Sequence, residues 1–157
     1  MADPVDYTFR SVWRVDAPPE DCYAVLYELK RYPEWWPEVK EVRPITDSKY
    51  ELRCRSLLPY DLRFTTARAV EDPDRKVLEA SMEGDLEGFS RWTIAAAAAG
   101  SLCTFDEHVI TNKPLLNKLA PVARPAFRAN HSLMMWNGRR GLRTFVAGYR
   151  LGRGGES

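Results

Sequence analysis

The 157-residue sequence has few of the residues that metal and redox sites require: two histidines, and three cysteines with no CxxC spacing. It also lacks an HExxH motif, a nucleophile elbow, a phosphate-binding glycine loop and a dinucleotide fingerprint. A metal site at Asp106, Glu107 and His108 is conceivable, but strand alternation would turn His108 away from Glu107. We therefore expect no metal and no cofactor, and the sequence points to no catalytic residue.

Long apolar runs and targeting signals are also missing. The longest run of small apolar residues, Ile94 to Gly100, is far shorter than the roughly 18 residues of a membrane span. The start, Met-Ala-Asp-Pro, lacks the basic and apolar regions of a signal peptide. The three cysteines (Cys22, Cys54 and Cys103) cannot all pair, which favours reduced thiols. These absences predict a soluble cytoplasmic protein with no membrane span.

Acidic residues are almost absent from the C-terminal part. Residues 1–112 carry 14 Lys and Arg against 21 Asp and Glu, whereas residues 113–157 carry 9 basic residues and one acid, Glu156. Such an asymmetry can mark a partner surface for nucleic acid or anionic lipid. The interpretation that we favour is a basic helix lying against an acidic sheet. Aromatic residues are not interleaved with the basic ones as in single-strand binders, so we expect no nucleic-acid partner.

Alternating apolar residues dominate the first 112 positions. They predict a strand over residues 7–15, and six more over 39–46, 49–57, 61–71, 75–84, 86–97 and 101–111. Turn residues separate these strands, so the connections are short and the sheet is antiparallel. Between the first two strands, residues 17–29 have a helical apolar stripe, and residues 31–37 break that helix and form a short second one. Five alanines at 95–99 are poor strand formers, so we expect that hairpin tip to be mobile or irregular.

The C-terminal part predicts helix. Residues 115–120 have a helical pattern, Pro121 and Pro125 each restart or kink it, and one long helix follows over residues 125–147. Its apolar stripe faces the sheet, while its arginines gather on the opposite side. We predict a single α+β domain over residues 1–157, with an ordered core at about 7–148 and a flexible tail at 149–157. In this fold a curved seven-stranded antiparallel sheet surrounds the long helix, with two short helices after the first strand.

Two glycines raise the question of an internal cavity. Gly138 and Gly141 lie on the helix face that points at the sheet, although glycine inside a helix costs up to about 1 kcal/mol relative to alanine. Either a ligand occupies the space or the helix approaches the sheet closely. Parity across the strands and the helix face predicts which apolar residues line such a cavity: Trp13, Phe64, Met82, Trp92, Phe105, Phe127 and Met134.

Three polar residues fall in phase with this interior: Glu107, Arg68 and His131. A charge unpaired in a dry core is costly, so each should be paired, hydrated in a cavity or displaced by a bulge. An inward Glu107 could serve a ligand as hydrogen-bond donor or general acid, or it could pair with an inward Arg68. A bulge would instead leave it in solvent. For His131 the alternatives are a ligand contact and a core histidine bonded to backbone.

Several local phrases resemble a known family. They are Val15-Asp16-Ala17-Pro18-Pro19-Glu20, Tyr32-Pro33-Glu34-Trp35-Trp36, Gly84-Asp85-Leu86-Glu87-Gly88 with Arg91-Trp92-Thr93, Thr111-Asn112-Lys113-Pro114, and Ala120-Pro121 through Asn130-His131. Together with the element order, they resemble the START-like superfamily (SRPBCC, helix-grip fold), and within it the polyketide cyclase/dehydrase and lipid-transport branch. The resemblance covers roughly residues 7–147. The tract at 95–100 departs from the polar hairpin that the family would place there.

The resemblance implies a deep cavity that binds or transports a hydrophobic small molecule, such as a lipid, a quinone or a polyketide-like compound. An aromatic polyketide cyclase or dehydratase is the alternative, and a protein-interaction module that uses the basic C-terminal helix is a second alternative. The cyclases share no transferable catalytic motif, so no catalytic residue is carried over. The candidate ligand-binding residues are the seven apolar positions together with Arg68, Glu107 and His131.

Overall fold

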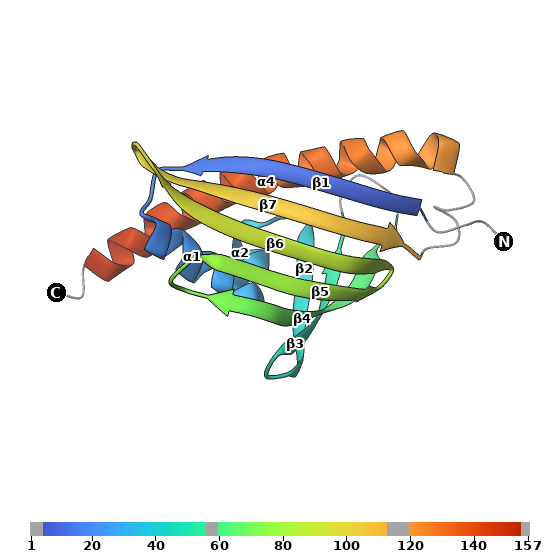
Figure 1. Ribbon diagram of the computed structural model, residues 1–157, viewed down its shortest axis with the longest axis horizontal. Coiled ribbons are helices and arrows are strands. Elements are labelled where there is room, and N and C mark those ends of the chain that lie inside the picture. The colour runs from blue at the N-terminus through green and yellow to red at the C-terminus, as the bar shows by residue number, and fades with distance from the viewer. Residues whose placement is uncertain (1–4, 56–59, 113–119, 155–157) are drawn as a thin grey trace.

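The computed structural model describes residues 5–55, 60–112 and 120–154, and it has the predicted fold class. The elements in chain order are β1 (Val5–Val15), α1 (Pro19–Tyr27), a 3-10 turn (Leu29–Arg31), α2 (Tyr32–Trp35), β2 (Val39–Thr46), β3 (Lys49–Cys54), β4 (Leu62–Asp72), β5 (Val77–Gly84), β6 (Leu86–Ala97), β7 (Gly100–Thr111) and α4 (Ala120–Gly154). All neighbouring strands are antiparallel, in the order β1-β7-β6-β5-β4-β3-β2. Figure 1 shows α4 running along one side of the curved sheet.

Alternation places the two faces of the sheet as predicted. In β1, Tyr7, Trp13 and Val15 are buried. β1 pairs with β7 from Val5↔Thr111 to Val15↔Ser101 without a bulge, so every second residue of both strands keeps the same face. Pro44 lies in β2, an edge strand, where its missing N–H costs no ladder hydrogen bond.

The long helix differs from its prediction at both ends. α4 begins at Ala120, continues through Pro125 and ends at Gly154, instead of covering residues 125–147. Pro121 and Pro125 are exposed, so water can reach the backbone groups that the prolines leave without a helical partner. The helix predicted at 115–120 lies, apart from Ala120, outside the described residues.

Close approach explains the two glycines of α4. A Cβ on Gly138 would lie 2.7 Å from Cε2 of Trp36 and 2.8 Å from Cη2 of Trp13. A Cβ on Gly141 would overlap the backbone carbonyl of Trp35. The indole of Trp36 also donates a 2.9 Å hydrogen bond to the carbonyl of Met134. The glycines therefore let α4 touch α2 and β1, and they leave no space for a ligand at these positions.

The alanine-rich hairpin is regular, so the prediction of an irregular tip is wrong. The ladder between β6 and β7 continues to Ala97↔Gly100, with a two-residue turn at 98–99. Gly100 has φ +155°, and a Cβ there would overlap the carbonyl of Val15. Pairing with β7 and the glycine at the turn outweigh the weak strand propensity of alanine. Among the described residues, the structure has no helix that is both long and apolar enough to span a membrane.

Candidate ligand-binding cavity

A partly open cavity of about 140 Å³ lies between the concave face of the sheet, α4 and the segment from α1 to α2. Its wall is mainly apolar and draws on β2 to β7, on Leu26, Leu29, Tyr32 and Trp36, and on the first half of α4. The volume is close to that of an engineered apolar cavity of about 150 Å³ that stays dry and binds benzene. The space therefore suits an aromatic ring or a short apolar chain.

Nine of the ten predicted site residues border this cavity. They are Phe64, Arg68, Met82, Trp92, Phe105, Glu107, Phe127, His131 and Met134. Trp13 does not border it, so its predicted position on the wall is wrong. Its ring packs edge-on against Trp92, with 4.8 Å between centroids, and against Trp36 at 5.5 Å. Trp13 supports two wall residues from behind, because α4 and α2 come closer to β1 than parity alone could indicate.

The main polar feature of the wall is a contact between β7 and α4. Alternation turns Glu107 inward, and its Oε1 lies 3.2 Å from Nε2 of His131. Only 10% of the Glu107 side chain and 13% of the His131 side chain are exposed. The His131 ring stacks on Phe9, with 3.6 Å between centroids, which fixes the orientation of the imidazole. The pair offers a hydrogen-bonding acid and base beside an apolar space.

Three alternatives for Glu107 and His131 are thereby decided. Glu107 is not displaced to solvent, since the β1–β7 register has no bulge. Its partner is His131 instead of Arg68, and His131 contacts a carboxylate instead of backbone. Outside the cavity, His108 contacts Asp6 at 2.6 Å on the opposite face, as its parity predicts. Within the described ranges, no three His, Cys, Asp or Glu side chains come together as a metal site would require.

Arg68 borders another part of the cavity and has its own partners. Its Nη2 donates a 2.8 Å hydrogen bond to the carbonyl of Tyr27, and its guanidinium lies 5.0 Å from the centre of that ring. Its Nε lies 3.6 Å from Glu71. A register shift between Arg68 and Val70 bends β4 at this point. The bulge is invisible to strict alternation, which is why the sequence could not assign the partners of Arg68.

Cys54 borders the cavity but is not a ready nucleophile. Burial, together with the nearby carboxylates of Glu107 and Glu38, raises the pKa of the Cys54 thiol to about 12. Burial likewise raises the pKa of Tyr32, whose hydroxyl donates a 2.7 Å hydrogen bond to the carbonyl of Leu26. Both groups stay protonated near neutral pH, so they contribute shape and hydrogen bonding to the site.

Sequence reasoning missed several wall residues. Tyr32 in α2 and Trp36 directly after it close the cavity, although the sequence predicted only a helix break and a short second helix there, without assigning these rings to the wall. Three aromatic rings within five residues were a signal that this break is buried. Asn130 and Ser90 also reach the wall, and Asn130 donates toward the sulfur of Met134 at 3.7 Å. Their short polar side chains gave no comparable signal.

Solved structures with this fold support the architecture. The Zhui aromatase/cyclase from a Streptomyces species is 15% identical, with a TM-score of 0.68 over 94% of each chain. A START superfamily protein from Mycobacterium smegmatis is 17% identical, with a TM-score of 0.68 over 93% of this chain and 98% of that one. The di-domain ARO/CYC StfQ of the steffimycin biosynthetic pathway is 18% identical, with a TM-score of 0.69; the match covers 94% of this chain but only 52% of StfQ. At such identities these likenesses show the fold alone.

No curated protein matches the chain. The family described as polyketide cyclase / dehydrase and lipid transport does match, and the match covers residues 15–137, which hold β2 to β7, α1, α2 and the cavity-lining half of α4. The chain therefore belongs to the polyketide cyclase/dehydrase and lipid transport family.

Proposed function

We propose that the protein binds a hydrophobic small molecule in the cavity between the sheet and α4. The observation that carries this proposal is a partly open, mainly apolar space of about 140 Å³ with one oriented polar pair on its wall. Small-molecule sites are commonly built in this way, with a few placed polar groups among apolar side chains. All three cysteines are buried thiols, which supports a reducing, cytoplasmic location for this binding.

The volume of the cavity limits the size of the ligand that can bind. The volume admits one ring or a short chain without rearrangement. A lipid, a quinone or a polyketide-like compound would therefore place its ring or one chain end inside. Anything larger requires α4 or the segment from α1 to α2 to move. Glu107 and His131 favour ligands with a carbonyl or hydroxyl oxygen at the buried end, because that oxygen would replace lost hydrogen bonds to water.

A dye titration tests the proposal. The fluorescent dye ANS should bind the wild-type protein with one of its rings in the cavity, and replacing Met134 by Trp should weaken binding at least about tenfold by filling that space. Ser132→Trp is the matched control, since Ser132 is exposed on the same helix and lies outside the cavity wall. Equal binding by both variants would remove the cavity as the site. Native mass spectrometry of the purified protein would identify any ligand that is carried along.

A second candidate is an enzyme of the cyclase or dehydratase type, and the contact between Glu107 and His131 favours it. A buried acid–base pair can take a proton from a carbon beside a ketone and return a proton to the oxygen. The resulting enol can then attack a second carbonyl, or water can be lost. The Zhui and StfQ structures are described as an aromatase/cyclase and an ARO/CYC, which is consistent with such chemistry on this fold.

Glu107→Gln separates the two candidates because it keeps the shape of the side chain and removes its charge. If the protein is an enzyme, turnover of a poly-ketone substrate should fall by about 10²-fold or more, while ANS binding changes little. Glu83→Gln, at an exposed position of β5, is the control for net charge. Unchanged turnover in Glu107→Gln would exclude this carboxylate as the acid or base.

A further inference from the structure

The exposed side of α4 carries an unusual combination of side chains. Four exposed arginines (Arg124, Arg128, Arg140 and Arg143) lie along it, with two exposed apolar residues, Val122 at 78% and Trp136 at 48% exposure. We call these six residues the arginine face. From Val122 to Arg143 they extend about 32 Å at 1.5 Å per residue. No acidic residue occurs anywhere in α4.

The charges of the arginine face are not neutralised within the described part of the chain. Arg124 and Arg143 donate hydrogen bonds to backbone carbonyls of β1, at 3.1 Å and 2.7 Å. Arg128 lies over the ring of Tyr7, and Arg140 lies 4.7 Å from the ring centre of Trp136. None of these partners is a carboxylate. α4 lies against the sheet, as expected, but these four arginines contact carbonyls and aromatic rings there.

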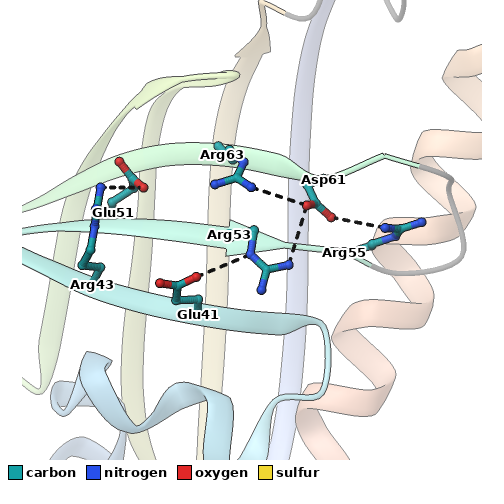
Figure 2. Close-up of polar contacts among 7 residues, drawn as sticks. All are labelled: Glu41, Arg43, Glu51, Arg53, Arg55, Asp61 and Arg63. Carbon is teal, nitrogen blue, oxygen red and sulfur yellow. Dashed lines mark ion pairs between the residues drawn. The ribbon is translucent and has the colours of Figure 1, made fainter.

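Acidic residues on the outer face of the sheet form ion pairs with arginines of the same sheet. On its outer face, Arg43 contacts Glu51 at 3.0 Å and Arg53 contacts Glu41 at 3.6 Å, as Figure 2 shows. Asp61 lies within 3.8 Å of three arginines: Arg53, Arg55 and Arg63. This interleaving leaves little net charge on that surface. The basic excess of the protein is thus concentrated on the arginine face.

We infer that the arginine face docks on an anionic lipid bilayer. The fit is one of charge: the four exposed arginines have carbonyls and aromatic rings as contacts, so their charge can attract lipid phosphates, and each basic residue near such a surface strengthens binding roughly fivefold. Trp136 and Val122 supply exposed apolar groups on the same line, and tryptophan rings favour the headgroup region. The opposite side of α4 packs in the core, so the helix lies on the bilayer surface and does not enter it.

The inference goes beyond ligand binding but suits it, because a carrier of a water-insoluble molecule must meet the phase that holds it. The docking surface and the cavity are formed by different residues of α4, so either can fail without the other. An acidic protein is the competing occupant. The two exposed apolar residues lie about 21 Å apart along one line, which suits a flat partner better than a compact epitope.

Vesicle binding tests the inference. The full-length protein should sediment with phosphatidylcholine vesicles that contain about a third phosphatidylglycerol, and not with phosphatidylcholine alone. Raising salt from about 0.1 M to about 1 M should abolish binding, since screening then acts within about 3 Å. The double variant Arg128→Gln/Arg140→Gln should bind about 25-fold more weakly. Both side chains are exposed and lie against aromatic rings, so the fold should survive, and thermal unfolding checks this.

The control variant changes net charge by the same amount on the other surface. Arg43→Gln/Arg63→Gln removes two exposed arginines from the ion pairs of Figure 2 and should leave vesicle binding nearly unchanged. Trp136 gives an independent signal, because the other four tryptophans are at most 6% exposed and only Trp136 is open to an aqueous quencher. Binding to anionic vesicles should reduce the quenching of Trp136 fluorescence by iodide.

Three results would overturn the inference: no binding to anionic vesicles, equal loss in both double variants, or a Trp136 that stays fully accessible when the protein is bound. Tight binding to soluble polyglutamate with none to vesicles would also overturn it and would assign the face to an acidic protein. The ANS titration is run on the same variants. Its failure alone would remove the proposed ligand site and leave the membrane inference standing.

Discussion

Three glycine-to-alanine substitutions in α4 distinguish close packing from an empty space. Alanine in place of glycine inside an exposed helix normally adds about 1 kcal/mol of stability. Gly148 should show this gain, since a Cβ there meets nothing within 4 Å. At Gly138 the new methyl group would meet the rings of Trp36 and Trp13, and at Gly141 the backbone of Trp35, so we expect the opposite sign.

The atoms that a new methyl group would meet determine how much stability each variant loses. At Gly138 the obstacles are the rings of Trp36 and Trp13, which are 6% and 2% exposed and cannot swing away. Overpacking of this kind costs about 1–3 kcal/mol, so the net loss after the propensity gain is about 1 kcal/mol. At Gly141 the obstacle is a backbone carbonyl, which moves only if α2 moves. We expect a net loss of about 2 kcal/mol or more there.

Thermal and urea unfolding of the three variants give the answer. For a chain of this size 1 kcal/mol corresponds to roughly 2–4 °C in Tm, so Gly148→Ala and Gly141→Ala should differ by about 10 °C. The three variants share one helix and one chemical change, so propensity alone predicts equal gains. Equal gains, or a Gly138→Ala variant that gains stability while losing ANS binding, would refute close packing and restore a ligand space at the glycines.

Two further predictions concern protonation. Cys54 should react with iodoacetamide extremely slowly at pH 8, where a pKa of about 12 leaves about one thiol in ten thousand ionised. Glu107→Gln should accelerate that reaction, because it removes a negative charge that raises the pKa of Cys54; peptide mapping locates the label, and an unchanged rate would contradict the proximity of the two groups. The second prediction is alkaline instability. Because burial raises the pKa values of Cys54 and Tyr32, the unfolded chain loses these protons first, and the free energy of unfolding should be constant up to about pH 8.5 and fall from there through pH 12. Denaturant titrations across that range check it, and a flat profile would mean that neither group is buried in the native state.

The sheet could be predicted from the sequence because the alternation of residues along each strand determines which side chains lie on the buried face. In β7, Cys103, Phe105, Glu107 and Val109 share one parity, and all four lie on the buried face. The same rule placed nine of the ten candidate residues on the cavity wall. Parity works here because the β1–β7 and β6–β7 ladders run without a bulge. It failed to find the partners of Arg68 because a register shift interrupts β4 directly after that residue.

How closely two elements approach could not be predicted, since distance between elements has no sequence period. Trp13 has the parity of a wall residue, yet it lies behind the wall because Gly138 lets α4 settle against Trp36. The sequence shows glycines at positions 138 and 141, but space for a ligand and close approach of the helix explained them equally well. Only the positions of Trp35 and Trp36, on a segment with no regular pattern, decide between packing and space.

The sequence also could not show which charged side chains pair with one another, and this matters for function. The excess of acids before residue 113 and of basic residues after it suggested a basic helix lying against an acidic sheet. Ion pairs form between side chains, however, and the alternation that exposes Arg43, Arg53 and Arg63 also exposes Glu41 and Glu51 on neighbouring strands. The sheet therefore neutralises itself across its strands. α4 has no acidic residue of its own, and its exposed side faces away from the sheet, so its charge remains available to a partner outside the chain.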